Sequence, residues 1–209
     1  MRTQSARWLG LLGRVVVLGL SGCLGGSASE PLWFTLSAPA GASASAPAGA
    51  SAAPVAERPE LGLVLGALEL PRYLDRAELV TRDGPHGLRV WNGVRWGGSL
   101  RTDAQRLLAD ELARLLGTSR ITAYPAEARF PVDYRVLVEL LELGSAPGQP
   151  VALRARWTIA GGDGRAVAVG ATSLAEPPAS ASWPDYVAAH RAALATLAHE
   201  IAARIAALP

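Results

Sequence analysis

The sequence predicts an α+β fold, a two-layer sandwich in which two amphipathic helices pack on one face of a mainly antiparallel sheet. Two helical stripes and one set of alternating strands support this prediction. Over 100–116 and 182–208, apolar residues recur three or four positions apart, the spacing of one core-facing side of a helix. Between them, 132–174 alternates apolar and polar residues, as strands with one buried face do. Because each element has one apolar face, stacking in two layers buries them all.

The strands of the predicted meander are identified by their alternation. Residues 132–141 and 151–159 place an apolar side chain at every second position. Leu137 and Leu141 fall on the opposite face of the first of these strands, so that face is only partly polar. Gly-Gly-Asp-Gly at 161–164 is a tight turn into a third strand at 166–174, which completes an antiparallel meander. Shorter apolar or β-prone runs predict further strands at 32–36, 61–70, 77–81 and 118–124, and residues 88–96 are expected to lead into the first helix.

Both helices carry signals at their ends. Gly117 follows the last periodic leucine of the first helix and is typical of a helix stop. Ser182 is an N-cap for the second helix, and Pro184 lies in its first turn. We therefore expect one helix over 100–116 and a second that ends near Leu208.

The start of the chain has the pattern of a lipoprotein signal. Arg2, Arg7 and Arg14 precede an apolar run over 15–20, and Leu20-Ser21-Gly22-Cys23 places small residues before the single cysteine. This run resembles the bacterial lipobox. The resemblance implies that Cys23 is acylated, becomes the new N-terminus and anchors the protein to a membrane. The alternative is a buried cysteine near a cleaved or disordered N-terminus.

The sequence predicts one folded domain after this signal. We assign residues 1–22 to the signal peptide, 23–59 to a lipidated tether with a short first strand and a linker, and 60–209 to the α+β domain. The linker, 37–59, is almost wholly alanine, serine, proline and glycine. Such a composition cannot bury enough apolar area to offset the entropy lost on ordering.

Composition excludes several classes of function. Of the 20 basic residues three lie in the signal, which leaves 17 against 18 acidic residues. The mature chain therefore lacks the positive charge that nucleic-acid binding requires. A single cysteine allows no internal disulfide, and no apolar run after Cys23 is long enough to span a bilayer as a helix.

The sequence offers no catalytic constellation. His86 lies in a turn and His190 and His199 on the last helix, with no serine or cysteine nucleophile in a recognisable context. His190 and His199 are nine positions apart, so they lack the i, i+4 geometry of a helical zinc site. We interpret His190 and His199 as solvated helix positions and expect no enzyme activity, cofactor or metal. A periplasmic hydrolase is the alternative, which a measured turnover would support.

The run Leu70-Pro71-Arg72-Tyr73-Leu74-Asp75-Arg76 is the most specific of several segments that match one known family in order. The others are Cys23, Trp33-Phe34-Thr35-Leu36, Leu79-Val80-Thr81-Arg82, Arg95-Trp96, Tyr124-Pro125, Asp133-Tyr134-Arg135-Val136 and Asp185-Tyr186. Together they resemble the PqiC/YmbA family, the auxiliary lipoprotein component of ABC-type and MCE-type lipid transport systems. This sequence departs from the pattern in the long linker after its first strand.

The resemblance implies a lipid-anchored protein on the periplasmic face of the outer membrane of a Gram-negative bacterium. There it would meet the distal end of an MCE protein tunnel, which is anchored in the inner membrane with its permease, and would contribute to lipid movement and envelope integrity. By analogy with lipoprotein sorting, Leu24 rather than an aspartate after the cysteine favours the outer membrane. A stand-alone structural envelope lipoprotein without a transporter is the alternative.

The candidate surface for a partner, or for another copy of the chain in a homo-oligomer, consists of Pro71, Tyr73, Leu74, Asp75, Arg76 and Trp96. Tyrosine and arginine are enriched at interface hot spots. The alternative is conformational, with Pro71 ending a strand and Asp75 pairing with Arg76 across the turn. For Trp91 and Trp96, we favour cover of the edge of the core over contact with lipid or a partner.

Overall fold

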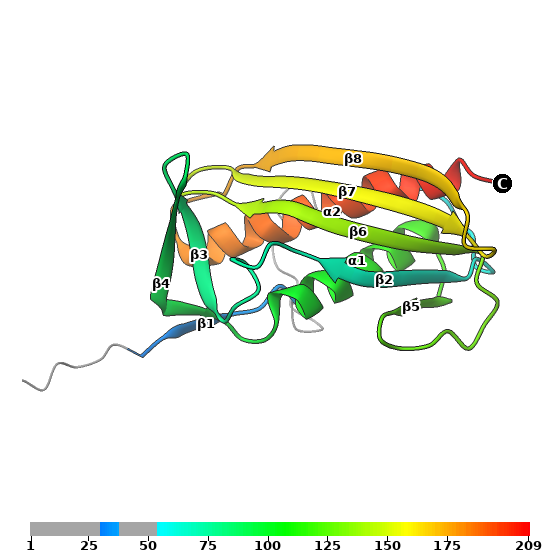
Figure 1. Cartoon of the computed structure of the whole chain (residues 1–209), viewed down its shortest axis with the longest axis horizontal. Coiled ribbons are helices and arrows are strands. Elements are labelled where there is room, and N and C mark those ends of the chain that lie inside the picture. The colour runs from blue at the N-terminus through cyan, green and yellow to red at the C-terminus, as the bar shows by residue number, and fades with distance from the viewer. Residues whose placement is uncertain (1–29, 38–53) are drawn as a thin grey trace, which may run out of the picture.

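The structure is a computed structural model that describes residues 30–37 and 54–209. In this part of the chain, two sheets and two helices form the α+β arrangement of Figure 1. The elements are β1 (Leu32–Phe34), β2 (Leu63–Glu69), β3 (Glu78–Asp83), β4 (Gly87–Trp96), α1 (Leu100–Leu116), β5 (Ile121–Ala123), β6 (Tyr134–Gly144), β7 (Val151–Gly161), β8 (Ala166–Glu176) and α2 (Trp183–Ala206). The predicted signal peptide and Cys23 lie outside the described residues.

The larger sheet has five strands in the order β5-β2-β6-β7-β8. Strands β6, β7 and β8 pair antiparallel, which confirms the predicted meander. Strand β2 instead pairs parallel with both β5 and β6. Parallel neighbours need a long crossover connection, and here the chain passes through β3, β4 and α1 before it returns to this sheet.

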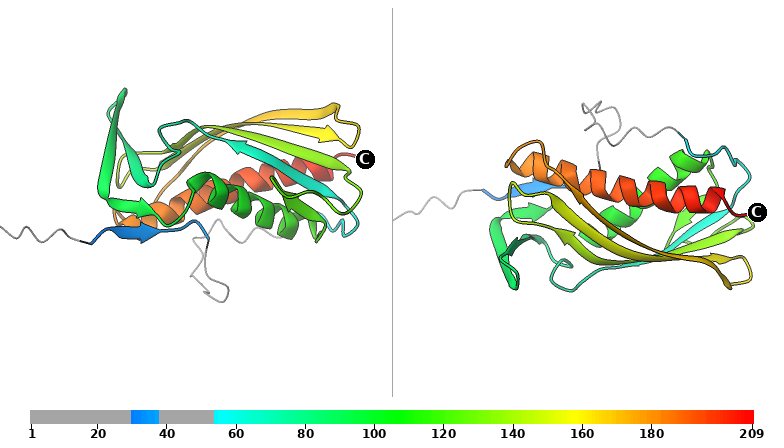
Figure 2. Two further views of the ribbon diagram at one scale, coloured as in Figure 1. Left: turned by 60° about the horizontal axis from the view of Figure 1, so that its bottom comes forward. Right: turned by 90° about the horizontal axis from the view of Figure 1, so that it is seen from above.

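Both helices lie on the same side of this sheet, as Figures 1 and 2 show. Helix α1 contacts β2 and β5, α2 contacts β7 and β8, and the two helices also contact each other. The layer between the helices and the sheet is apolar. Its fully buried side chains include Leu108, Leu112, Leu115, Val136, Leu153, Ile159, Leu194, Leu197 and Ile201. The predicted two-layer α+β fold is therefore confirmed.

The helix ends are capped as the sequence predicts. The Ser99 side chain accepts a hydrogen bond from the Thr102 amide at the start of α1, and Gly117 ends that helix with a φ of 59°. A φ in this left-handed region favours glycine. At α2, the Ser182 side chain accepts from the Asp185 amide, and Pro184 occupies the first turn. Each serine cap satisfies an amide that would otherwise lack a partner within its helix.

A second, three-stranded sheet of order β1-β4-β3 stands at one end of the molecule (Figure 1). Residues 87–96 form a full strand in it, rather than only the lead into α1 that the sequence suggested. A register shift between Glu78 and Leu79 interrupts the pairing of β3 with β4. Such a bulge breaks the simple two-residue alternation by which a strand is recognised.

Strand β1 belongs to this small sheet although the linker separates it from the rest of the domain. It pairs parallel with β4, and the Gly97 amide donates to the Phe34 carbonyl oxygen at 2.7 Å. Leu36 is fully buried, and Arg191 of α2 donates to its carbonyl oxygen. The segment before the linker is thus built into the fold.

Candidate functional site

The motif at 70–76 forms a compact turn that joins β2 of the large sheet to β3 of the small one. The Leu74 amide donates to the Pro71 carbonyl oxygen at 2.9 Å, and the Arg76 amide donates to that of Leu74 at 2.9 Å. The Leu74 side chain is buried in the core. Local hydrogen bonds and one apolar anchor therefore fix the shape of the turn and leave its polar side chains at the surface.

Asp75 and Arg76 of the turn do not pair with each other as the conformational interpretation proposed. Asp75 instead binds Arg101 of α1 at 2.7 Å, and the same guanidinium donates to the Leu68 carbonyl oxygen at 2.9 Å. Arg76 binds Glu78 at 3.0 Å. The reason is that each charge finds an opposite charge on a neighbouring element. Because these groups are in contact with water, which screens their charges, neither pair is a major source of stability.

Tyr73 packs into the junction between the two sheets. The Arg82 guanidinium lies 5.9 Å from the centre of the Tyr73 ring. Burial raises the pKa of the Tyr73 hydroxyl above its usual value of 10.0, and the positive charge of Arg82 offsets part of that rise. The ring therefore stays neutral at physiological pH, and it presents an apolar face and a hydroxyl group beside a cation.

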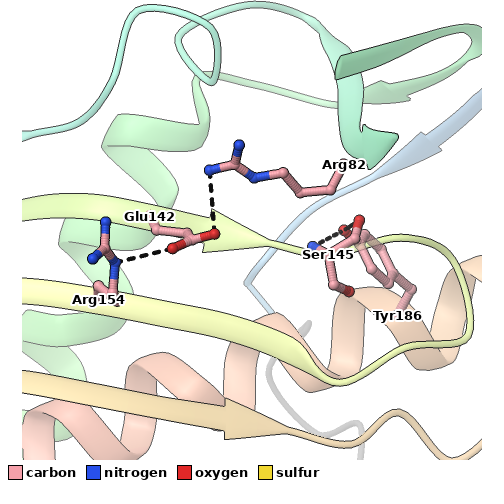
Figure 3. Close-up of polar contacts among 5 residues, drawn as sticks. All are labelled: Arg82, Glu142, Ser145, Arg154 and Tyr186. Atoms are coloured by element: carbon pink, nitrogen blue, oxygen red, sulfur yellow. Dashed lines mark hydrogen bonds and ion pairs between the residues drawn. The ribbon is translucent and has the colours of Figure 1, made fainter. Parts of the chain in front are cut away.

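Arg82 belongs to a network of salt bridges that joins three strands (Figure 3). It binds one carboxylate oxygen of Glu142 at 3.2 Å, and Arg154 binds the other at 3.0 Å. Glu142 is on β6, Arg82 on β3 and Arg154 on β7. The Glu142 carboxylate therefore connects the small sheet to the large one next to Tyr73.

A second polar connection at this junction is buried. The Tyr186 hydroxyl accepts a hydrogen bond from the Ser145 amide and donates one to the Ser145 carbonyl oxygen, both at 3.0 Å (Figure 3). The Arg82 amide donates to the same carbonyl oxygen at 3.1 Å. Tyr186 is 1% exposed, and its burial raises the pKa of its hydroxyl. The family resemblance included Asp185-Tyr186 and so pointed to this residue. Its hydrogen-bond partner Ser145, however, lies 41 positions away in the sequence.

The interpretation of His190 as a solvated residue was wrong. Its side chain is 3% exposed, and its Nδ1 lies 2.8 Å from the Tyr186 carbonyl oxygen. Burial lowers the pKa of the imidazole to about 4. The ring meets Trp96 edge-on, with 5.9 Å between centres, and Tyr186 at 4.6 Å. Position 190 fits the helical spacing between the apolar residues Val187 and Leu194, so the periodicity contained the signal.

The structure divides the predicted interface residues into two groups. Pro71, Tyr73, Asp75 and Arg76 reach the surface of one turn, with Pro71 and Tyr73 partly buried. Leu74 and Trp96 are 5% and 4% exposed, so they support this surface from the core. The Trp96 amide holds the end of the turn by donating to the Ala77 carbonyl oxygen at 2.8 Å. The role of these residues in partner binding stays a prediction, as does acylation of Cys23.

The face of the large sheet away from the helices carries a groove, lined by apolar and charged side chains, that the sequence analysis did not assign. Its volume is about 540 Å³, and it runs across β2, β6, β7 and β8. Leu137 and Val169 line it and are 51% and 73% exposed. Leu137 was visible in the sequence as an apolar residue on the polar side of its strand.

Among the described residues, no three His, Cys, Asp or Glu side chains lie together in a way that could hold a metal ion. In the same part of the chain, neither helix combines the length and apolarity needed to cross a bilayer.

Comparison with known proteins identifies the family. Residues 34–202 match the family described as ABC-type transport auxiliary lipoprotein component. The chain belongs to this family. The PqiC/YmbA resemblance is thereby confirmed, and this is a family of auxiliary transport lipoproteins, not of known enzymes. A lipoprotein family indicates a membrane-anchored place in the cell envelope. A search of curated proteins found no match.

Two solved structures are similar in fold. One is a Xanthomonas campestris protein of the family DUF330, with a TM-score of 0.59 and 17% identity over 74% of this chain and 91% of that one. The other is an uncharacterised protein, with a TM-score of 0.64 and 13% identity over 84% of this chain and 99% of that one. At these identities, the likeness supports the fold alone.

Proposed function

We propose that this protein is a periplasmic accessory component of an MCE-type intermembrane lipid transport system. Acylated Cys23 anchors it in the outer membrane, and its domain docks at the outer-membrane end of the MCE conduit. The match to auxiliary transport lipoproteins over residues 34–202 carries this proposal. Its partners are an MCE-domain protein and, through that protein, an inner-membrane permease, and its action contributes to outer-membrane integrity.

The anchor is proposed from the sequence. Small residues precede Cys23 and a Leu-Gly-Gly-Ser tether follows it. A stable anchor needs more than one acyl chain or a second binding element, which a diacylated cysteine supplies. The acyl chains at the start of this tether then hold the domain at the membrane. The Cys23→Ala variant should give a soluble or uncleaved product, and its recovery in acylated form in the outer membrane would contradict the assignment.

The turn at 70–76 is the proposed contact with the MCE protein. Its backbone is held by its own hydrogen bonds and by Leu74 in the core, so Tyr73, Asp75 and Arg76 are presented in a fixed arrangement. Docking on a preorganised surface loses less conformational entropy than docking on a mobile one. Tyrosine and arginine are also the residue types that most often dominate binding energy.

The test is co-purification of the acylated protein with the MCE protein. The double variant Tyr73→Ala/Asp75→Ala should weaken this association, or the self-association of the chain, more than it lowers thermal stability. Arg165→Ala is the matched control, because Arg165 is exposed in the β7–β8 turn at the opposite end of the molecule. Loss of stability with unchanged association would support the purely conformational role of the turn.

The alternative, a structural envelope lipoprotein without a transporter, is separated from this proposal by deletion. Only a transport accessory predicts that loss of this protein gives the same envelope defects as loss of the MCE protein. A strain that lacks both should then be no more permeable than either single deletion. Additive defects would favour the independent structural role.

A further inference from the structure

One face of the small sheet carries three exposed apolar side chains among its charged ones. The pairing of β1, β4 and β3 places Trp33, Leu88 and Val90 on the same face, opposite the one that packs toward α2. Their exposed fractions are 57%, 43% and 38%. We call this set, Trp33, Leu88 and Val90, the outer apolar patch. Val90 and Leu88 lie five and seven positions along β4 from Arg95, the register partner of Trp33, so the three side chains are spread along this face. Exposed apolar area on one face of a sheet is typical of a surface that meets another phase or another molecule.

The charge around this patch is positive. Residues 71–96, which comprise the turn and strands β3 and β4, contain five arginines and three carboxylates. All three carboxylates are paired with arginines: Asp75 with Arg101, Glu78 with Arg76 and Asp83 with Arg89. Two further arginines also have charged partners: Arg82 binds Glu142 of β6, and Arg95 lies 3.7 Å from Glu78. Arg72 is exposed and has no charged partner among the described residues. Since the mature chain carries 17 basic and 18 acidic residues, this positive excess is local to the small sheet.

Trp33 has the environment of a residue at a lipid interface. The Arg95 guanidinium lies 5.8 Å from the centre of its ring, so an exposed aromatic side chain stands beside a half-buried cation, which also lies 3.7 Å from Glu78. Tryptophan is enriched at the boundary between lipid chains and water. Basic residues near an anionic membrane each contribute about 1 kcal/mol of attraction. An anionic lipid surface complements both features.

The tether brings this end of the domain to the membrane. Nine positions separate Cys23 from Leu32, which is at most about 30 Å of extended chain. The chain then enters the fold at β1, on the small sheet. The β7–β8 turn lies at the opposite end of the molecule (Figure 1), one 11-residue strand away, or about 36 Å. The small sheet is therefore the part of the domain closest to the anchor.

We propose that the small sheet rests on the membrane that holds the anchor, with the outer apolar patch at headgroup level and the surrounding arginines against anionic phosphates. The long axis of the large sheet then points away from the membrane. This orientation rests on the proposed acylation of Cys23. It also keeps the 70–76 turn near the lipid surface, which is where the end of a conduit to that membrane would arrive.

Quenching of tryptophan fluorescence by brominated lipid tests this orientation. The acylated protein is reconstituted in vesicles of phosphatidylethanolamine and phosphatidylglycerol, with bromine on the acyl chains near the headgroup. We expect the native protein to be quenched, and Trp33→Phe to lose most of that quenching. Trp157→Phe is the matched control, because Trp157 is 8% exposed in the large sheet, and it should leave the quenching unchanged.

Two inserted reporters keep the test independent of any folding effect of the Trp33 substitution. In the Trp33→Phe background, Leu88→Trp should restore the quenching and Val169→Trp, in the groove on the large sheet, should not. If the Val169→Trp variant were quenched and the Leu88→Trp variant were not, the orientation would be overturned. Equal quenching in neutral phosphatidylcholine vesicles would overturn the role of the arginines.

Mass spectrometry of the same sample separates the two levels of the argument. An acylated Cys23 together with an unquenched Trp33 would overturn the proposed orientation and leave the anchored transport accessory intact. A Cys23 without an acyl chain would overturn the proposed function, and the orientation with it.

Discussion

The buried contact between Tyr186 and Ser145 gives a sharp test of how the two sheets are joined. Tyr186→Phe removes one oxygen atom and keeps the ring. The Ser145 carbonyl oxygen still accepts from the Arg82 amide at 3.1 Å, but the Ser145 amide loses its partner. Ser145 is 8% exposed and Tyr186 is 1% exposed. A buried donor without a partner costs about 1 to 3 kcal/mol, so we expect a loss of about 2 kcal/mol in the free energy of unfolding.

Urea unfolding of the non-acylated Cys23→Ala chain measures this loss. With a denaturant slope of about 1 to 3 kcal/mol/M, the midpoint should fall by about 1 M without a change of slope. The melting temperature should fall by about 4 to 8 °C. Tyr73→Phe is the control, because the Tyr73 hydroxyl is at the edge of the same junction and only partly buried. Equal losses in the two variants would refute the reasoning, since burial of the contact would then have no effect.

Changes at His190, Gly170 and Ser182 test three other contacts. Burial lowers the pKa of His190 from 6.5 to about 4, so its contribution to stability is complete above pH 6.5 and is lost as the pH falls toward 4. Between pH 6.5 and 4, the free energy of unfolding measured in urea should fall by roughly 3 kcal/mol more for the native protein than for His190→Leu. The same dependence of this free energy on pH in both proteins would contradict the prediction. A Cβ at Gly170 would lie 2.1 Å from the Trp157 ring, so Gly170→Ala should cost about 1 to 3 kcal/mol and change the near-UV circular dichroism. Gly93→Ala, where a Cβ meets nothing within 4 Å, should cost much less. Ser182→Ala should cost about 1 kcal/mol and Ser182→Gly only a few tenths; equal melting temperatures for the two would exclude a capping role.

The elements that the sequence predicted well are those whose signals are local. Helix α1 occupies Leu100–Leu116 as expected, because its leucine spacing, its cap and Gly117 all lie within one stretch. The β6–β8 meander was recognised from alternation along each strand and the short turns between them. The parallel pairing of β2 with β5 and β6 had no such signal, because nothing within a strand specifies a neighbour that lies more than 50 positions away.

The candidate site was found in part for the same reason. The run from Leu70 to Arg76 is contiguous, so the family resemblance located it. Its supporting partners are not contiguous: Asp75 binds Arg101, 26 positions away, and Arg82 binds Glu142, 60 positions away. Pairing Asp75 with its neighbour Arg76 was the natural local choice, and it failed because α1 brings a guanidinium closer.

The incorporation of β1 determines how a mechanical load on the anchor would travel. A pull on Cys23 reaches the domain at Leu32 and is transmitted through three register pairs to β4. The remaining load is transmitted to α2 through the hydrogen bond from Arg191 to the Leu36 carbonyl oxygen. The load does not pass through residues 38–53, because the Phe34 carbonyl oxygen accepts a hydrogen bond from the Gly97 amide before them and the Val55 amide donates one to Leu115 after them. Because residues 38–53 follow this connection in the chain, the distance between lipid and fold does not depend on how many residues they comprise.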